Sequence, residues 1–111
     1  MATVIDYRTC VQDLLQEYAN LRSSSPGTET QVVFDTKHDH YQLVNVGWHN
    51  NHRIYGCILH LDVKSDKIWI QHNMTEHDIA QDLVERGIPK QNIVIGFHSP
   101  DRRQFTEYAL N

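Results

Sequence analysis

The sequence predicts an α+β fold in which two helices pack on a sheet built mainly as an antiparallel meander. Three observations lead to this prediction: an amphipathic period near the N-terminus, two consecutive hairpin patterns in the middle of the chain, and a helix stop followed by a short apolar run. We expect a single domain over residues 1–111, because a chain of 111 residues has the size of one ordinary domain.

The first predicted element is an amphipathic helix from Thr3 to about Arg22. Its apolar residues recur at steps of three and four, whereas its charged residues fall elsewhere on the helical wheel. The apolar positions are Val4, Tyr7, Val11, Leu14, Leu15, Tyr18 and Leu21. Segment 23–28, which contains a Pro-Gly pair, ends this period and predicts a loop.

Four strands are then predicted to pair with their neighbours in chain order. The two tight turns between them are Asn50-Asn51 and Ser65-Asp66, and a polar turn over residues 37–40 joins the first two strands. The strands are expected at Gln31–Asp35, Tyr41–Trp48, Arg53–Val63 and Lys67–Gln71.

Alternation along the third strand predicts two faces of different character. The core face is expected to hold Tyr55, Cys57, Leu59, Leu61 and Val63. The other face holds, in order, Ile54, Gly56, Ile58, His60 and Asp62. Because this face starts apolar and ends polar, we expect a neighbour to cover only its first half.

The second helix is predicted from Thr75 to Arg86, with Thr75 as its N-cap and Asp78 as the reciprocal capping residue. Its end is strongly marked. Gly87 can take the left-handed position, Ile88 can fold back onto the helix, and the proline that follows prevents continuation.

The C-terminal region is predicted to add one short strand and one short turn. Ile93–Ile95 is too short for a helix and suits a buried strand, and Ser99-Pro100 can begin a final turn. The tail Phe105–Leu110 is apolar enough to dock on the body of the domain.

Composition argues for a cytoplasmic protein and against several functional classes. An apolar fraction of 40% and a charged fraction of 22% are ordinary for a globular domain, and no apolar run approaches the roughly 18 residues of a spanning helix. Cys10 and Cys57 have no framework spacing and are expected to remain unpaired. The net charge of −4 disfavours tight binding to DNA by this chain alone.

Eight histidines raise the hypothesis of a metal site. The best pair is His38 and His40, whose rings would share one side of an extended segment. Zinc sites need three or four convergent ligands, and no tight cysteine–histidine spacing is present, so we predict no metal and no cofactor. His60 and Asp62 share a strand face and suggest acid–base chemistry, but no nucleophile or phosphate-loop motif accompanies them, and we predict no catalytic residue.

Two further groups are candidates for binding surfaces. The aromatic residues on the hairpins are expected to cluster, and together with the apolar second face they predict an interface of Trp48, Ile54, Tyr55, Ile58 and Trp69. Arg102 and Arg103 are candidates for contacting an anion or a nucleic acid, against the alternative of a solvated rim.

Several stretches give the chain a family resemblance. The most specific are Phe34-Asp35, Val46-Gly47-Trp48, Gly56-Cys57-Ile58-Leu59-His60-Leu61-Asp62, Lys67-Ile68-Trp69-Ile70-Gln71, Gly87-Ile88-Pro89 and Arg103-Gln104-Phe105-Thr106-Glu107. With these stretches the chain resembles the XisI family, the fdxN element excision controlling factors, from Ile5-Asp6-Tyr7-Arg8 to Glu107-Tyr108-Ala109.

The resemblance implies a controlling factor that acts, with a companion XisH protein, on excision of a DNA element in nitrogen-fixing cyanobacteria, while a separate recombinase performs the strand chemistry. We therefore expect a non-catalytic accessory protein that binds a protein partner, and a homodimer is a further expectation. Two alternatives remain: a nucleic-acid-binding accessory that gathers Arg53, Lys64, Lys67, Arg102 and Arg103, and a small hydrolase that uses His60 and Asp62.

Overall fold

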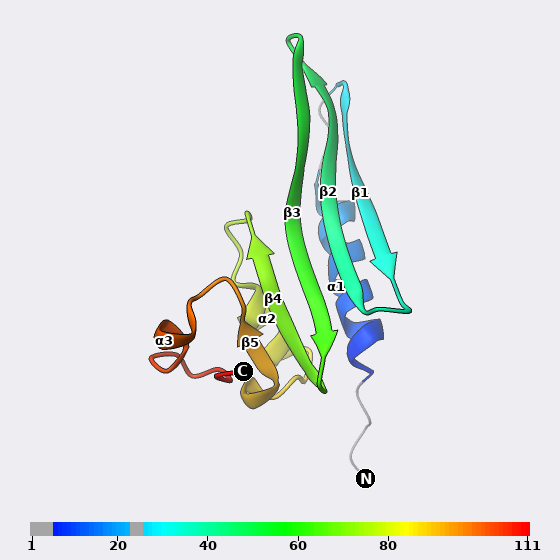
Figure 1. Ribbon diagram of the computed structural model, residues 1–111. Helices are drawn as coiled ribbons and strands as arrows, with labels where there is room; N and C mark the ends of the chain where they lie inside the picture. Colours follow the sequence, from blue (N-terminus) through cyan, green and yellow to red (C-terminus); the bar gives the residue numbers. More distant parts are fainter. Residues whose placement is uncertain (1–5, 23–25) are drawn as a thin grey trace.

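The computed structural model describes residues 6–22 and 26–111, which form a five-stranded sheet with its two longer helices on one face (Figure 1). The strands are ordered β1-β2-β3-β4-β5; the first four are antiparallel, and β5 runs parallel to β4. This arrangement confirms the predicted α+β fold with its four-stranded meander. The elements are α1 (Tyr7–Leu21), β1 (Thr28–Asp35), β2 (His40–His49), β3 (His52–Lys64), β4 (Lys67–Asn73), α2 (Ile79–Glu85), the 3₁₀ turn η1 (Lys90–Asn92), β5 (Ile93–Ile95) and α3 (Pro100–Arg103).

Both predicted tight turns are confirmed. Asn50 and Asn51 have φ angles of 48° and 64°, and Ser65 and Asp66 have φ angles of 54° and 60°. Two successive left-handed residues are the mark of a type I′ turn, whose twist matches that of the flanking strands. These turns hold β2, β3 and β4 in sequence and build the long central hairpin of Figure 1.

Helix α1 packs its apolar stripe onto the sheet. Val11, Leu14 and Leu15 are fully buried, and Asp6 caps the helix by accepting hydrogen bonds from the backbone N–H groups of Arg8 and Thr9. The prediction that the helix starts at Thr3, with Val4 in the stripe, lies outside the described residues.

Leu21 belongs to the apolar period of α1 but is not buried. Its side chain is 77% exposed at the last position of α1. It lines a hollow between the end of α1 and the loop before α2, together with Tyr18 and His77, so the helix has passed the packed part of the sheet at this point.

The predicted faces of β3 are wrong in their first half because the strand contains a β-bulge. Leu43 pairs with Leu59 but Val44 pairs with Cys57, which leaves Ile58 as an extra residue. Alternation therefore changes sides at the bulge: Ile58 and Leu59 are both buried, whereas Tyr55 points to solvent and is 73% exposed. A second register shift, between His60 and Leu61, leaves Gln71 as the extra residue of β4.

The second helix begins later than predicted. It starts at Ile79, and Asp78 is its N-cap, because the Asp78 carboxylate accepts a hydrogen bond from the Gln81 N–H. The Thr75 hydroxyl instead accepts from the backbone N–H of His77, in a turn that precedes the helix. A side chain–backbone bond of this kind stabilises a turn where the backbone has not yet entered the helix.

The end of α2 is confirmed as a Schellman motif. Gly87 has a φ of 102°, and its N–H donates to the carbonyl of Val84 while that of Ile88 donates to Leu83. Ile88 is 1% exposed and belongs to the core, as the sequence predicts.

The C-terminal segment covers the outer edge of β5. The Ala109 N–H donates to the Ile93 carbonyl at 2.9 Å, and Tyr108 packs against the core, which confirms the docked tail, although Phe105 is 84% exposed. Helix α3 begins at Pro100 with Ser99 before it, as predicted. Among the described helices, none combines the length and the apolar character needed to cross a bilayer.

A polar link ties α1 to α2 on the helical side of the domain. The Tyr18 hydroxyl donates to the Asp82 carboxylate at 3.0 Å, and Arg86 contacts Asp82 and Glu17 at 2.8 and 2.6 Å. Partial burial, reinforced by the neighbouring Asp82, raises the pKa of Tyr18 to about 12.

We expect the stability of Tyr18→Phe to lack the decrease at high pH that ionisation of Tyr18 causes in the wild-type protein. The folded-state pKa of Tyr18 is about 12 against an ordinary value of 10, so its stabilising contribution is intact below pH 10 and is lost as the pH rises toward 12. At pH 8 the variant should be less stable by about 1 kcal/mol, the worth of one hydrogen bond. The difference should shrink between pH 10 and pH 12 in urea unfolding. A difference that stays constant over this range would contradict the assignment.

Candidate functional site

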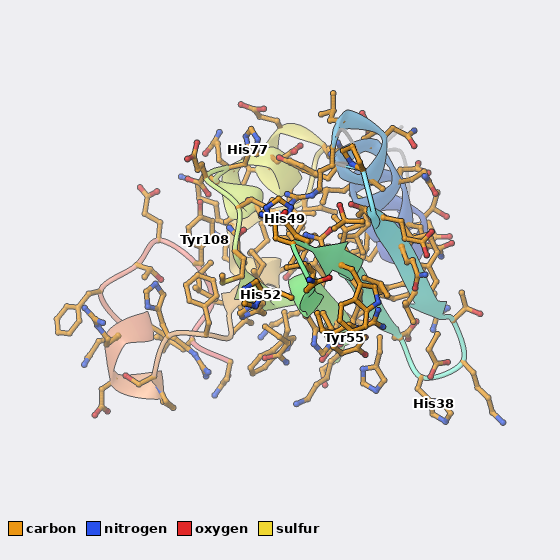
Figure 2. All side chains as sticks on the ribbon, turned by 90° about the horizontal axis from the view of Figure 1, so that it is seen from above. His38, His49, His52, Tyr55, His77 and Tyr108 are labelled. Atoms are coloured by element: carbon orange, nitrogen blue, oxygen red, sulfur yellow. The ribbon has the colours of Figure 1, made fainter. Side chains whose placement is uncertain are left out.

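The sheet surface turned away from α1 and α2 is the candidate site, and we call it the open face. The strand register shows that the two ends of this face carry side chains of different chemistry. Figure 2, which looks along the sheet, shows Tyr55 pointing away from the helices. The apolar end carries Val46, Trp48 and Tyr55, and the polar end carries His40, His60, Asp62, Gln71 and Trp69.

The apolar end presents two aromatic side chains to solvent. Trp48 is 56% exposed and Tyr55 is 73% exposed. Trp48 lies opposite Arg53 across the hairpin, and the Arg53 guanidinium carbon stands 5.4 Å from the centre of the indole ring. The β2–β3 hairpin thus holds an exposed aromatic pair with a cation beside it.

The predicted clustering of the three hairpin aromatics is wrong, since Trp69 lies at the other end of the open face. Trp48 pairs with Arg53 and Trp69 pairs with Asp62, so the length of β3 between these partners separates the two indoles by about 30 Å. Lys64 and Arg103 instead flank the Trp69 ring, at 4.6 and 5.3 Å from its centre.

The five predicted interface residues do not share one surface. Ile58 is 6% exposed and lies in the core, and Ile54 pairs with Gly47 on the side of the sheet that faces the helices. The bulge at Ile58 is the cause, because it reverses the faces that simple alternation assigns. Only Trp48, Tyr55 and Trp69 lie on the open face.

At the polar end, three strands bring three polar side chains together around the carboxylate of Asp62. Asp62 Oδ1 lies 2.9 Å from His40 Nδ1 and 2.8 Å from His60 Nε2, while Gln71 Nε2 donates to Asp62 Oδ2 at 3.1 Å. His40 comes from β2, His60 and Asp62 from β3, and Gln71 from the bulge of β4. The predicted contact between His60 and Asp62 is therefore present, but inside a larger cluster.

The hydrogen bonds of this cluster favour the charged forms of Asp62 and His40. Burial alone would raise the pKa of Asp62, but the hydrogen bonds from His40, His60 and Gln71 outweigh burial and lower it. The same hydrogen bond to Asp62 raises the pKa of His40. Asp62 is 9% exposed and holds its charge because its partners replace the lost water.

The hypothesis that the rings of His38 and His40 share one side of an extended segment does not hold in the structure. Asp39 between them has a φ of 61° and turns the chain, so the segment is not extended. His38 Nδ1 contacts Asp35 at 2.9 Å, and Figure 2 shows His38 at the outer end of the β1–β2 turn. His40 points instead to Asp62 on the open face.

The two C-terminal arginines differ in role. Arg103 donates to the carbonyls of His98, Gly96 and Leu110 and so holds the C-terminal segment in place. Arg102 is exposed on α3. Contact of Arg102 and Arg103 with an anion or a nucleic acid therefore stays a prediction, with Arg103 already engaged by three carbonyls.

The remaining candidates have structural surroundings. Cys10 and Cys57 are both free thiols, and burial raises the pKa of each, which disfavours the reactive thiolate. Sequence reasoning missed Gln71 and missed His40 as a partner of Asp62. A register count across the β2–β3 hairpin gives His40 the wrong partner unless the bulge is known, because without it His40 would face Leu61.

Comparison with known proteins agrees with this architecture. The family model described as XisI protein matches residues 1–110. A crystal structure of a XisI-like protein from Anabaena variabilis ATCC 29413 is 42% identical, with a TM-score of 0.91 over 95% of this chain and 96% of the other. The fdxN element excision controlling factor XisI from the same organism is 32% identical, with a TM-score of 0.84 and the same coverage of both chains. A search of the curated proteins found no match. The chain belongs to the XisI family.

Proposed function

We propose that this protein is a controlling factor for excision of a DNA element and that it acts without catalysis, by binding a protein companion of the XisH kind. Family membership and the name of the 32% identical structure support the excision role. The observation that carries the binding mode is the exposed aromatic pair, Trp48 and Tyr55, on the open face.

Physical chemistry favours this pair as a binding anchor. Tryptophan and tyrosine dominate interface hot spots because each buries a large area and loses few rotamers. The hairpin already fixes the backbone of both residues, and Arg53 beside Trp48 adds a charge at the rim. A net charge of −4 makes a protein partner a better match for this chain than the DNA backbone.

Co-expression with an XisH-like protein followed by gel filtration tests the proposal. We expect the two proteins to elute together. Trp48→Ala and Tyr55→Ala should each raise the dissociation constant of the complex about tenfold or more, as hot-spot truncations do. Phe105→Ala is the matched control, since Phe105 is also an exposed aromatic residue but lies outside the sheet. Separate elution of the wild-type proteins, or equal weakening by the control, would contradict the proposal. Light scattering on the protein alone tests the homodimer.

A nucleic-acid-binding accessory is the second candidate, favoured by the basic residues around Trp69. Lys64 and Arg103 flank this ring, and Lys67 pairs with Lys64 across the hairpin, whereas Arg53 lies at the far end of β3. Several of these groups are already engaged: Lys67 donates to the Asn111 carbonyl, and Arg103 to three carbonyls. Retardation of DNA at low salt that falls steeply with added salt would favour this candidate.

The hydrolase alternative has less support. The hollow along the first half of β3 is lined by Arg53, Ile54, Tyr55 and their neighbours and does not include His60 or Asp62. Asp62 is shared between two imidazoles and an amide, so His60 is not paired with it as a simple dyad. We propose instead a binding role for this cluster.

A further inference from the structure

The donor atoms of His40, His60 and Asp62 converge on one point of the open face. One ring nitrogen of His40, one ring nitrogen of His60 and a carboxylate oxygen of Asp62 all lie within 4.8 Å of one another. Register brings them together: His40 lies directly across from Asp62, and His60 precedes Asp62 by two residues on the same face. Both ring nitrogens reach the same oxygen, Asp62 Oδ1.

We propose that His40, His60 and Asp62 form a binding site for a divalent transition metal, with Zn²⁺ as the best match. Two imidazoles and one carboxylate would take three positions of a tetrahedral ion, and the fourth would be open to water or to a partner's side chain. This inference departs from the sequence prediction of no metal, which examined His38 with His40. It is also independent of the proposed role in excision.

The spacing of the donors, which lie within 4.8 Å of one another, suits such an ion after rotation of the side chains. Ligands of tetrahedral zinc stand about 3.3–3.5 Å apart, because each lies about 2.0–2.2 Å from the metal. The two hydrogen-bonded contacts in the cluster are 2.8 and 2.9 Å. Each would open by about half an ångström on binding, which side-chain rotation can supply since the His40 side chain is 57% exposed.

The surroundings of Asp62 match those of a metal-binding carboxylate. Gln71 Nε2 donates to Oδ2 at 3.1 Å, which orients the carboxylate and leaves Oδ1 for the ion. Gly96 makes room for the Gln71 amide, because a Cβ at Gly96 would stand 2.6 Å from Gln71 Oε1. The Gln71 amide thus supplies the outer hydrogen bond that orients a metal ligand and helps a metal site to bind tightly.

The donor set selects the class of ion. Two nitrogens and one oxygen suit zinc, nickel, copper or iron, whereas magnesium and calcium require mostly oxygen donors. Among these ions, zinc is best matched to three protein ligands with one open position, and it carries no redox demand. The open face leaves that position accessible beside the exposed His40.

Titration of chelator-treated protein with Zn²⁺ by calorimetry, and with Co²⁺ by visible absorption, tests the site. We expect one ion per chain and the strong visible bands of tetrahedral cobalt. His40→Ala and His60→Ala should each abolish the cobalt bands. Gln71→Ala should lower the affinity for zinc about tenfold or more, as loss of an orienting partner does. His38→Ala is the matched control, since His38 lies two residues from His40 but contacts only Asp35 among the described side chains.

Two results would overturn the proposal. One is the absence of zinc binding and of cobalt bands in the wild-type protein. The other is binding that persists unchanged in His40→Ala or that falls equally in His38→Ala, which would indicate adventitious surface histidines. His40 is exposed, so His40→Ala decides the question even if His60→Ala fails to fold.

Discussion

Leu14→Ala is expected to lower the free energy of unfolding by about 3 kcal/mol. Leu14 is fully buried in the stripe of α1 that packs on the sheet, so truncation removes apolar contacts and leaves a cavity. Domains of this size have a total stability of about 5–15 kcal/mol, so a loss of this size is a large fraction of the whole. Urea unfolding followed by circular dichroism measures it through the midpoint at constant m-value.

Leu21→Ala on the same helix is the matched control. Both leucines occupy the predicted apolar stripe, but Leu21 is 77% exposed. Its truncation should change stability by less than about 0.5 kcal/mol. Similar losses for the two variants would show that α1 packs differently from the arrangement described.

Gly47→Ala is expected to destabilise the domain by about 2 kcal/mol or more, because both space and backbone conformation exclude a Cβ there. A Cβ would lie 2.1 Å from the Gly27 carbonyl oxygen and 2.6 Å from Thr28 Cα, and both atoms belong to the backbone. The φ of Gly47 is 154°, which side chains rarely adopt. The substitution should also separate the start of β1 from β2, since the Trp48 N–H donates to the Gly27 carbonyl at 2.8 Å.

Gly56→Ala provides the contrast within the same sheet. A Cβ at Gly56 would meet nothing within 4 Å. Alanine there restricts the unfolded chain without strain in the folded one, so we expect stabilisation of about 0.4–1 kcal/mol. Thermal unfolding of both variants checks the pair, and destabilisation of Gly56→Ala comparable to that of Gly47→Ala would contradict the geometric reason given.

The parts of the fold that local chemistry determines could be predicted from the sequence. The turns at Asn50-Asn51 and Ser65-Asp66 depend on residues that tolerate left-handed conformations, and the end of α2 depends on Gly87. Each signal lies within a few residues of the element that it controls. The meander follows from them, because short turns force neighbouring strands to pair.

The candidate site could not be predicted in the same way, because it depends on the register between distant strands. The bulge at Ile58 moves the partner of His40 from Leu61 to Asp62, and this bulge was not predicted from the residues near Ile58. The bulge at Gln71 then brings a third side chain to the Asp62 carboxylate. Sequence reasoning found His60 and Asp62, which one strand holds at fixed spacing, and missed the contributions of the neighbouring strands.

The pairing of strands in chain order has a consequence for synthesis on the ribosome. Helix α1 leaves the exit tunnel before the strands, but fifteen residues are marginal for a helix alone in water. The strands that α1 contacts, β1, β2 and β3, emerge after it, and the rest of the core, including Ile68, Ile79 and Leu83, emerges later still. The nascent segment therefore becomes a stable helix only as this sheet surface is synthesised and folds.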